Sequence, residues 1–190
     1  MDKDEGTEIE HLVQKVVRHP KYDRETVDND IALLKIKTNE DFGPKRKSRK
    51  FRNANSFSSV CLPDQDEELP MDTKCTILGW GKEKPKHVLG SEVLREAKIP
   101  IASKQDCENY QKSSGYYFSD NMFCAGYKQG QVDTCTGDSG GPLLCEKDGR
   151  WTVYGITSFG EGCGEEGKYG MYAKVPNYTE WIDSIIWNVE

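Results

Sequence analysis

Short apolar runs separated by turn-forming residues dominate this chain of 190 residues. The runs are rich in Val, Ile, Leu and Tyr, and Gly, Pro, Asn or Asp lie between them. This succession of short runs and turns is typical of an all-β barrel or sandwich. We predict seven strands, over residues 11–18, 31–37, 74–78, 94–101, 141–145, 151–158 and 170–175.

Two helices are predicted beside the strands. Near the C-terminus, Asn177 is a candidate N-cap with Glu180 three residues further on, and apolar residues follow at helical spacing. This apolar stripe consists of Trp181, Ile182, Ile185, Ile186 and Val189. A shorter helix is predicted from Ser103 to Gln111, with Ser103 as its cap.

Charge and hydropathy exclude several classes of protein. Charged residues make up 31% of the chain and the net charge is −6, which argues against a nucleic-acid partner. No apolar stretch approaches the roughly 18 to 20 residues that a membrane span needs. The acidic start, residues 1–5, lacks the basic and apolar regions of a signal peptide.

Seven cysteines point to an oxidising compartment. They are scattered, form no Cys-x-x-Cys pair, and do not cluster with histidine as zinc ligands do. This distribution favours disulfides and an extracellular protein. An odd count leaves one cysteine without an internal partner. The unpaired cysteine and the missing signal peptide together suggest that N-terminal sequence of the parent protein is absent from this chain.

Two charged segments are predicted to be exposed. Residues 45–52, Lys-Arg-Lys-Ser-Arg-Lys-Phe-Arg, place six basic side chains in eight positions. Like charges cannot be buried together, so a solvated loop is the preferred interpretation. A processing site and a patch for acidic polysaccharide are the alternatives. Residues 61–70 are acidic and are predicted to connect two halves of the protein.

The strongest chemical motif surrounds Ser139, in the run Thr-Gly-Asp-Ser-Gly-Gly-Pro at 136–142. A serine hydroxyl is a poor nucleophile until a base takes its proton. Glycine at 137 allows the backbone to turn its N–H outward. With the N–H of Ser139, it can form an oxyanion hole.

This motif and residues 28–36, Asp-Asn-Asp-Ile-Ala-Leu-Leu-Lys-Ile, resemble chymotrypsin-family serine proteases of trypsin specificity. The resemblance covers nearly the whole chain. It implies a catalytic triad in which Ser139 is the nucleophile and Asp30 is the aspartate that orients the histidine. It also implies a double β-barrel with an incomplete first barrel, a complete second barrel and a C-terminal helix. The expected divisions are 1–62 for the first barrel, 63–74 for a connector and 75–190 for the second barrel.

The same resemblance implies a substrate preference. Asp133 matches the acid at the base of the trypsin-type pocket, and Gly160 and Gly170 match the small residues that leave this pocket open. A long Arg or Lys side chain of the substrate would therefore reach Asp133. A simple turn acid is the alternative interpretation of Asp133. The segment that begins at Ser158 and ends at Gly160 resembles the strand that pairs with substrate backbone.

Three disulfides follow from the resemblance, out of 15 ways to pair six cysteines. Cys61 matches the cysteine that tethers such proteases to an upstream propeptide or light chain, and it is the one left unpaired. The implied pairs are Cys75–Cys145, Cys107–Cys124 and Cys135–Cys163.

The family's Ala-Ala-His-Cys segment, which carries the catalytic histidine, does not occur in this chain. His11, His19 and His87 are expected to be ordinary surface residues. In the family, a freed N-terminal ammonium pairs with the aspartate that matches Asp138. Without it, we expect Asp138 to be buried without its cation or to swing outward, and the oxyanion hole to be unformed.

No cofactor or metal is predicted. Glu5 and Glu8 resemble the end of a calcium-binding loop, but the 6 to 8 oxygens that Ca²⁺ takes would have to come from upstream residues, so we expect the site to be unoccupied. The leading hypothesis is therefore a secreted trypsin-like endopeptidase domain, with protein substrates and protease inhibitors as partners. This chain is expected to be inactive because it lacks the catalytic histidine. The alternative is a non-catalytic homologue that acts as a binding or regulatory module.

Overall fold

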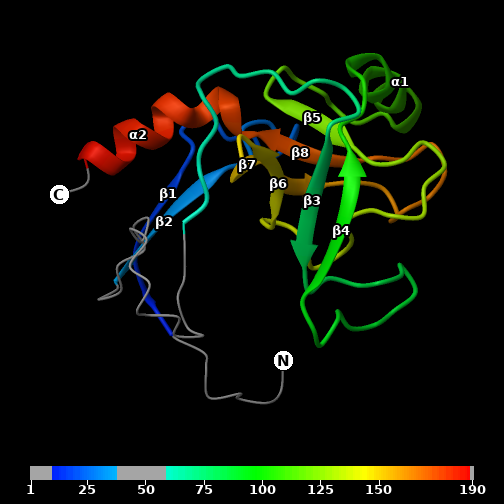
Figure 1. The fold of residues 1–190 in the computed structure, drawn as a ribbon, viewed down its shortest axis with the longest axis horizontal. Coiled ribbons are helices and arrows are strands. Elements are labelled where there is room, and N and C mark those ends of the chain that lie inside the picture. The colour runs from blue at the N-terminus through cyan, green and yellow to red at the C-terminus, as the bar shows by residue number, and fades with distance from the viewer. Residues whose placement is uncertain (1–9, 38–58, 189–190) are drawn as a thin grey trace.

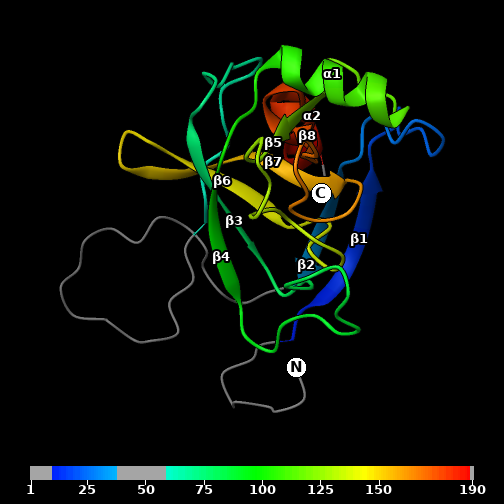
Figure 2. The same cartoon turned by 90° about the vertical axis from the view of Figure 1, so that its right-hand side faces the viewer.

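A computed structural model of the protein describes residues 10–37 and 59–188, which form a small sheet and a large sheet (Figures 1 and 2). The small sheet pairs β1 (Leu12–Arg18) with β2 (Ala32–Lys37) in antiparallel fashion. The strands of the large sheet are β3 (Lys74–Gly79), β4 (Arg95–Pro100), β5 (Met122–Ala125), β6 (Pro142–Lys147), β7 (Arg150–Phe159) and β8 (Gly170–Lys174).

The large sheet closes on itself. Its strand order is β4-β3-β6-β7-β8-β5, with antiparallel neighbours throughout. The two edge strands meet where Ile101 forms a bridge with Ala125, and the N–H of Gly126 donates to the carbonyl of Pro100 at 2.9 Å. Closure removes free edges and gives a barrel. The predicted all-β class is confirmed.

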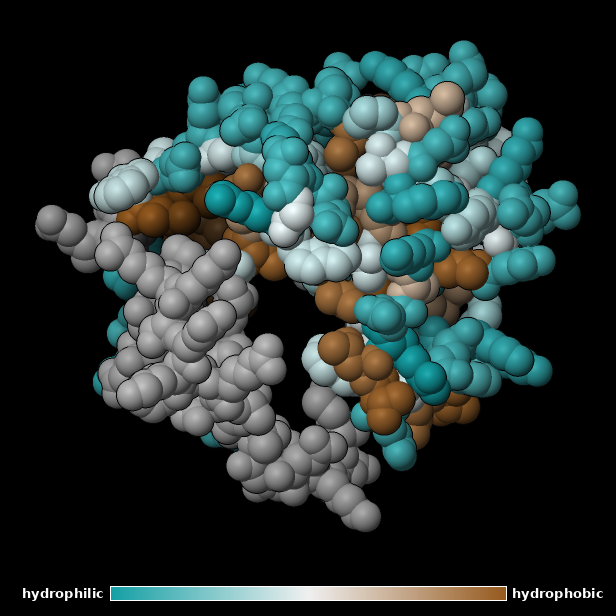
Figure 3. Space-filling view, in the orientation of Figure 1, coloured by the Kyte–Doolittle hydropathy of each residue, from teal (hydrophilic) through white to brown (hydrophobic). Residues whose placement is uncertain are grey.

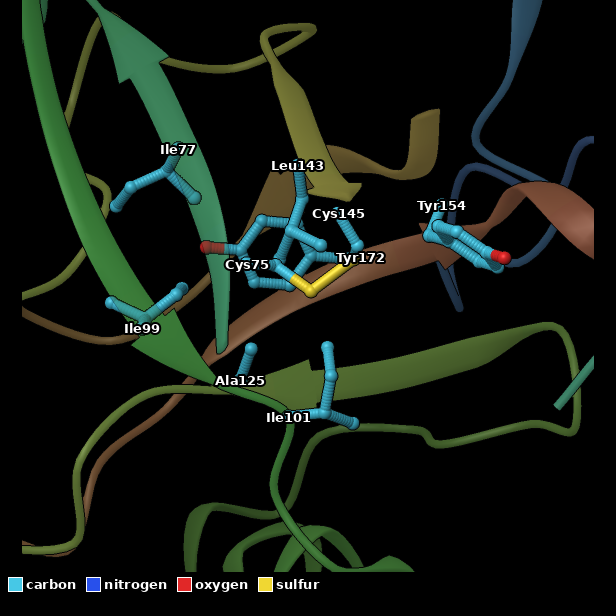
Figure 4. Close-up of a cluster of buried hydrophobic side chains, with 9 residues drawn as sticks. All are labelled: Cys75, Ile77, Ile99, Ile101, Ala125, Leu143, Cys145, Tyr154 and Tyr172. Carbon is cyan, nitrogen blue, oxygen red and sulfur yellow. A yellow bond between two sulfur atoms is a disulfide. The ribbon is translucent and has the colours of Figure 1, made fainter. Parts of the chain in front are cut away.

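The barrel interior is filled by side chains from β3, β4, β5, β6, β7 and β8 (Figure 4). The disulfide between Cys75 of β3 and Cys145 of β6 lies beside the ring of Tyr172. Phe123 stacks on Tyr172 with ring centroids 5.4 Å apart. Gly155 passes beneath Phe123 so closely that a Cβ there would lie 2.7 Å from the ring. The glycine therefore allows the aromatic packing of the core.

Both predicted helices form, with one corrected boundary. Helix α1 (Lys104–Ser114) is capped by Ser103, whose side chain accepts a hydrogen bond from the N–H of Asp106, as predicted. Helix α2 spans Thr179–Asn188 and follows a 3-10 turn over Val175–Tyr178. Asn177 lies inside that turn and donates to the carbonyl of Asp120, so the prediction that it caps α2 is wrong. No helix in the described part of the chain is long and apolar enough to cross a bilayer.

Helix α2 joins the two sheets. Ile182 is buried with Val153 of β7 and Tyr178, and Leu33 of β2 packs against the same cluster. The small sheet is otherwise poorly covered: the side chains of Val16 and Leu34 are 58% and 59% exposed. Its contact with the barrel therefore depends on α2 and on the loop between β1 and β2.

Each of the seven predicted runs contains a strand, and β5 is the only strand of the described residues that was missed. Four residues are too few to show an alternating pattern. Several sequence predictions, the basic segment 45–52, Glu5, Glu8 and the last residue of the apolar stripe, Val189, lie outside the described residues. The division at residues 62 and 74 stays a prediction.

Candidate active site

Two adjacent residues at the end of β7 hold both the predicted nucleophile segment and the predicted triad aspartate. The carbonyl of Thr157 accepts the N–H of Gly140 at 2.8 Å, and the N–H of Thr157 donates to the carbonyl of Gly141 at 2.9 Å. The next residue, Ser158, donates its hydroxyl to Oδ2 of Asp30 at 2.6 Å. The strand thus brings Asp30 from the small sheet to the segment that carries Ser139.

Ser139 is exposed at the tip of this segment, and its hydroxyl makes no hydrogen bond within the described residues. The backbone N–H groups of Gly137 and Ser139 also donate to no acceptor in the described part of the chain. Gly137 has a φ of 101°, a conformation that side chains disfavour. Both N–H groups are therefore available to bind an oxyanion from a ligand.

Backbone N–H groups, and no cation, satisfy the carboxylate of Asp138 within the described residues. Oδ1 accepts the N–H of Gly81 at 2.7 Å, and Oδ2 accepts the N–H of Cys135 at 2.9 Å. A Cβ at Gly79 or at Gly81 would overlap this carboxylate. The two glycines thus create the room that lets Asp138 point inward. Of the two states predicted for Asp138, the structure has the inward one, because the carboxylate is half-buried and forms no ion pair within the described residues.

A cavity of about 270 Å³ extends from Ser139 to Asp133. Asp133 lies near the Cys135–Cys163 disulfide, and Ser139 lies at the exposed end of the cavity. The lining residues are Asp133, Thr134, Cys135, Thr136, Gly137, Ser139, Thr157, Ser158, Phe159, Gly160, Gly162 and Gly170. The predicted nucleophile, the oxyanion donors and the predicted specificity acid therefore share one cavity.

The carboxylate of Asp133 has hydrogen-bond partners but no cation. Oδ1 accepts the N–H of Thr134 at 2.8 Å, and Oδ2 accepts the N–H of Gly164 at 3.1 Å. Burial raises the pKa of Asp133 to about 6, against the lowering effect of these bonds. The nearby Asp138 carboxylate also raises that pKa. An organic cation that entered the cavity would stabilise the ionised form.

The two glycines that were predicted to keep the cavity open differ in how closely their neighbours approach. At Gly170, a Cβ would lie 2.8 Å from Oδ1 of Asp133, so any side chain would disturb the carboxylate. At Gly160, the nearest atom to a Cβ would be the carbonyl oxygen of Tyr169 at 3.5 Å, an ordinary contact. Only Gly170 is therefore required by the packing around Asp133.

The structure contains the three disulfides that the resemblance implied. Cys61 is a free, half-buried thiol. Its N–H donates to the carbonyl of Trp151 at 2.9 Å, and its carbonyl accepts the N–H of Val153 at 3.0 Å. These two backbone hydrogen bonds fix the segment at Cys61 to β7.

None of the three histidines hydrogen-bonds to Ser139 or Asp30. The ring of His19 meets Tyr178 and Trp181 edge-on, at centroid distances of 5.2 and 4.8 Å. Burial and the nearby Lys21 lower the pKa of His19. Nδ1 of His11 lies 3.3 Å from the carbonyl oxygen of Lys37. His87 is exposed in the loop after β3.

Sequence reasoning missed the residues that hold the site in place. Gly164 and Thr134 anchor Asp133, and Gly81 anchors Asp138. All three contacts use backbone N–H groups, which carry no sequence signal. The described residues contain no group of three or more His, Cys, Asp or Glu side chains that could hold a metal ion.

Comparison with known proteins agrees with this geometry. The family model described as Trypsin matches residues 1–182. Transmembrane protease serine 5 of Homo sapiens is 36% identical over 171 residues, which cover 90% of this chain and 35% of that protein. Urokinase-type plasminogen activator of Gallus gallus is 38% identical over 175 residues, which cover 91% of this chain and 38% of that protein. The chain thus spans little more than a third of these relatives, and it belongs to the trypsin family of serine proteases.

Proposed function

We propose that this chain is part of a trypsin-like serine endopeptidase domain that hydrolyses peptide bonds after Arg or Lys. The observation that carries the proposal is the shared cavity, with Asp133 at its buried end and Ser139 at its exposed end. A substrate side chain that reaches Asp133 would leave its own carbonyl beside the hydroxyl of Ser139. This arrangement couples recognition of the side chain to cleavage of the adjacent bond.

The charge of the cavity supports the preference for Arg and Lys. Asp133 is surrounded by glycine, threonine and a disulfide, and no cation neutralises it within the described residues. A buried carboxylate without a counterion is costly, so a guanidinium or ammonium group gains a strong partner there. An apolar side chain would leave the charge unpaired.

The proposed chemistry is acyl transfer. Oγ of Ser139 attacks the scissile carbonyl, its proton passes to a base, and the N–H groups of Gly137 and Ser139 stabilise the oxyanion. The same base then protonates the leaving amine. Asp30, fixed by Ser158, is placed to orient an imidazole base. His11, His19 and His87 make other contacts or are exposed, which supports the proposal that none of them supplies this base.

The parent protein is proposed to be extracellular. Its three disulfides support an oxidising compartment. Cys61 is held at the surface of β7 with no partner, and we propose that it tethers the domain to a propeptide or light chain of a zymogen. Protein substrates and protease inhibitors are the partners that such a domain binds.

A second function is favoured by the positions of the histidines. A parent that lacks the imidazole base would be a non-catalytic homologue, which binds partners through the same cavity and strand edge. Ser158, Phe159 and Gly160 lie beyond the last β7 residue that pairs with β6, so this edge is open for strand addition. Retention of both Asp30 and Ser139 favours the enzyme.

Removal of the Asp133 charge is predicted to weaken binding of benzamidinium, a planar cation of suitable size. We expect Asp133→Asn to lower the affinity by about 100-fold, because the buried ion pair is lost. Isothermal titration calorimetry on the purified chain measures the affinity for benzamidinium. Glu166→Gln is the matched control: it removes an exposed acid of the neighbouring loop and should change the affinity by less than about twofold. Equal effects of the two variants would reject the assignment of the pocket.

Binding of benzamidinium is predicted to depend on pH through Asp133. Since the pKa of the empty site is about 6 and the ligand stays cationic, only the ionised carboxyl binds well. Affinity should be about tenfold lower at pH 5 than at pH 8, and should level off above pH 7. Calorimetric titrations across this range measure the profile. An affinity that is constant from pH 5 to pH 8 would contradict the prediction.

The purified chain is predicted to release no product from an arginine anilide above the buffer blank, because Ser139 lacks a base. Ser139→Ala should behave identically. Absorbance of the released aniline measures turnover, and a fluorophosphonate probe with mass spectrometry measures labelling of the hydroxyl. Turnover that disappears in Ser139→Ala, or stoichiometric labelling of Ser139, would show that a base is present.

A further inference from the structure

The loop of residues 80–91 projects from the barrel between β3 and β4 (Figure 1). Its ends are tied together, because the N–H of Ser91 donates to the carbonyls of Trp80 at 2.9 Å and Gly81 at 3.1 Å. A side chain at Gly90 would overlap the Trp80 carbonyl, so this closure needs glycine. Compact loops with joined ends, called Ω-loops, are frequently functional.

This loop and the residues after it expose apolar side chains. Val88 is 86% exposed and Leu89 is 79% exposed, while Val93 and Leu94 are about half exposed. Figure 3 shows hydrophobic side chains gathered in the lower part of the view, below β3 and β4, where the loop lies in Figure 1. Single exposed apolar residues are ordinary, but four within one short segment mark an interaction surface.

Lysines precede the apolar side chains in the loop. Lys84 and Lys86 are exposed, and neither forms an ion pair within the described residues. Residues 80–94 contain two acids: Glu83 is already paired with Arg95 at 2.8 Å, and Glu92 is exposed where the loop ends. The protein as a whole carries a net charge of −6, so the loop is a local basic region. Its complement is a surface that combines carboxylates with apolar side chains.

The loop also lies against the segment that carries the predicted nucleophile. Gly81 at its base donates its N–H to Asp138, and the N–H of Lys82 donates to the carbonyl of Thr136 at 2.9 Å. A protein that enters the cavity near Ser139 could therefore contact the loop at the same time. This position makes the loop suitable for recognition at a distance from the reacting bond.

We propose that the 80–91 loop, with Val93 and Leu94, is a docking surface for an acidic and apolar segment of a partner protein. A second copy of this chain is a poor fit, because the other exposed apolar face, on β1 and β2, also carries lysines at positions 15, 35 and 37. The docking surface is independent of the substrate preference proposed for the cavity.

Fluorescence anisotropy of a labelled peptide tests the docking surface. The probe is acetyl-Asp-Leu-Glu-Phe-Asp-Leu-Glu-amide with a C-terminal fluorophore, titrated with the purified chain at 0.05 M salt. We expect saturable binding, and an affinity about tenfold lower for Val88→Ser with Leu89→Ser, and again for Lys84→Glu with Lys86→Glu. These side chains are exposed, so the variants should fold.

Two matched controls accompany the loop variants. Ile186→Ser with Trp187→Ser removes another exposed apolar pair, on α2, and Lys112→Glu with Lys128→Glu reverses two exposed charges elsewhere. Both controls should bind the probe within about twofold of the parent chain. The proposal is overturned if the loop variants bind normally, if a control loses as much affinity, if a lysine-for-acid version of the peptide binds equally well, or if no binding occurs at millimolar concentration.

Discussion

Three consecutive side chains, those of Asp28, Asn29 and Asp30, attach the small sheet to the barrel. Asp28 accepts the hydroxyl of Ser119 at 2.6 Å, and Asn29 accepts the hydroxyl of Tyr178 at 3.4 Å. Asp30 accepts the third hydrogen bond, from the hydroxyl of Ser158. Because a two-stranded sheet is marginal by itself, these bonds and the packing on α2 position β1 and β2. The place of Asp30 in the site depends on this attachment.

The end of β7 provides the second half of the arrangement. Thr157 forms ladder bonds with the segment after Ser139, and Ser158 reaches across to Asp30. Beyond Thr157 the strand lines the cavity that ends at Asp133. One strand end therefore fixes the predicted nucleophile, the predicted triad aspartate and a wall of the pocket. A small change in this strand would displace all three together.

Sequence reasoning predicted the strands well, because each of the longer strands contains at least one Val, Ile, Leu or Tyr. It missed the strand at Met122–Ala125, which is too short to show a period. It misplaced the start of the last helix, because a 3-10 turn with Pro176 precedes it and includes Asn177. The residues of the cavity came from the Ser139 motif and the family resemblance. The backbone contacts that hold Asp133 and Asp138 leave no trace in the sequence, since any residue can supply an N–H.

Asp30 and Ser158 interact directly and so join the loop between β1 and β2 to β7. A double-mutant cycle with Asp30→Asn, Ser158→Ala and the combined variant measures this by denaturant unfolding. A hydrogen bond to a carboxylate at this distance predicts a coupling free energy of about 2 kcal/mol. Additive effects of the two substitutions, with a coupling below about 0.3 kcal/mol, would contradict the account.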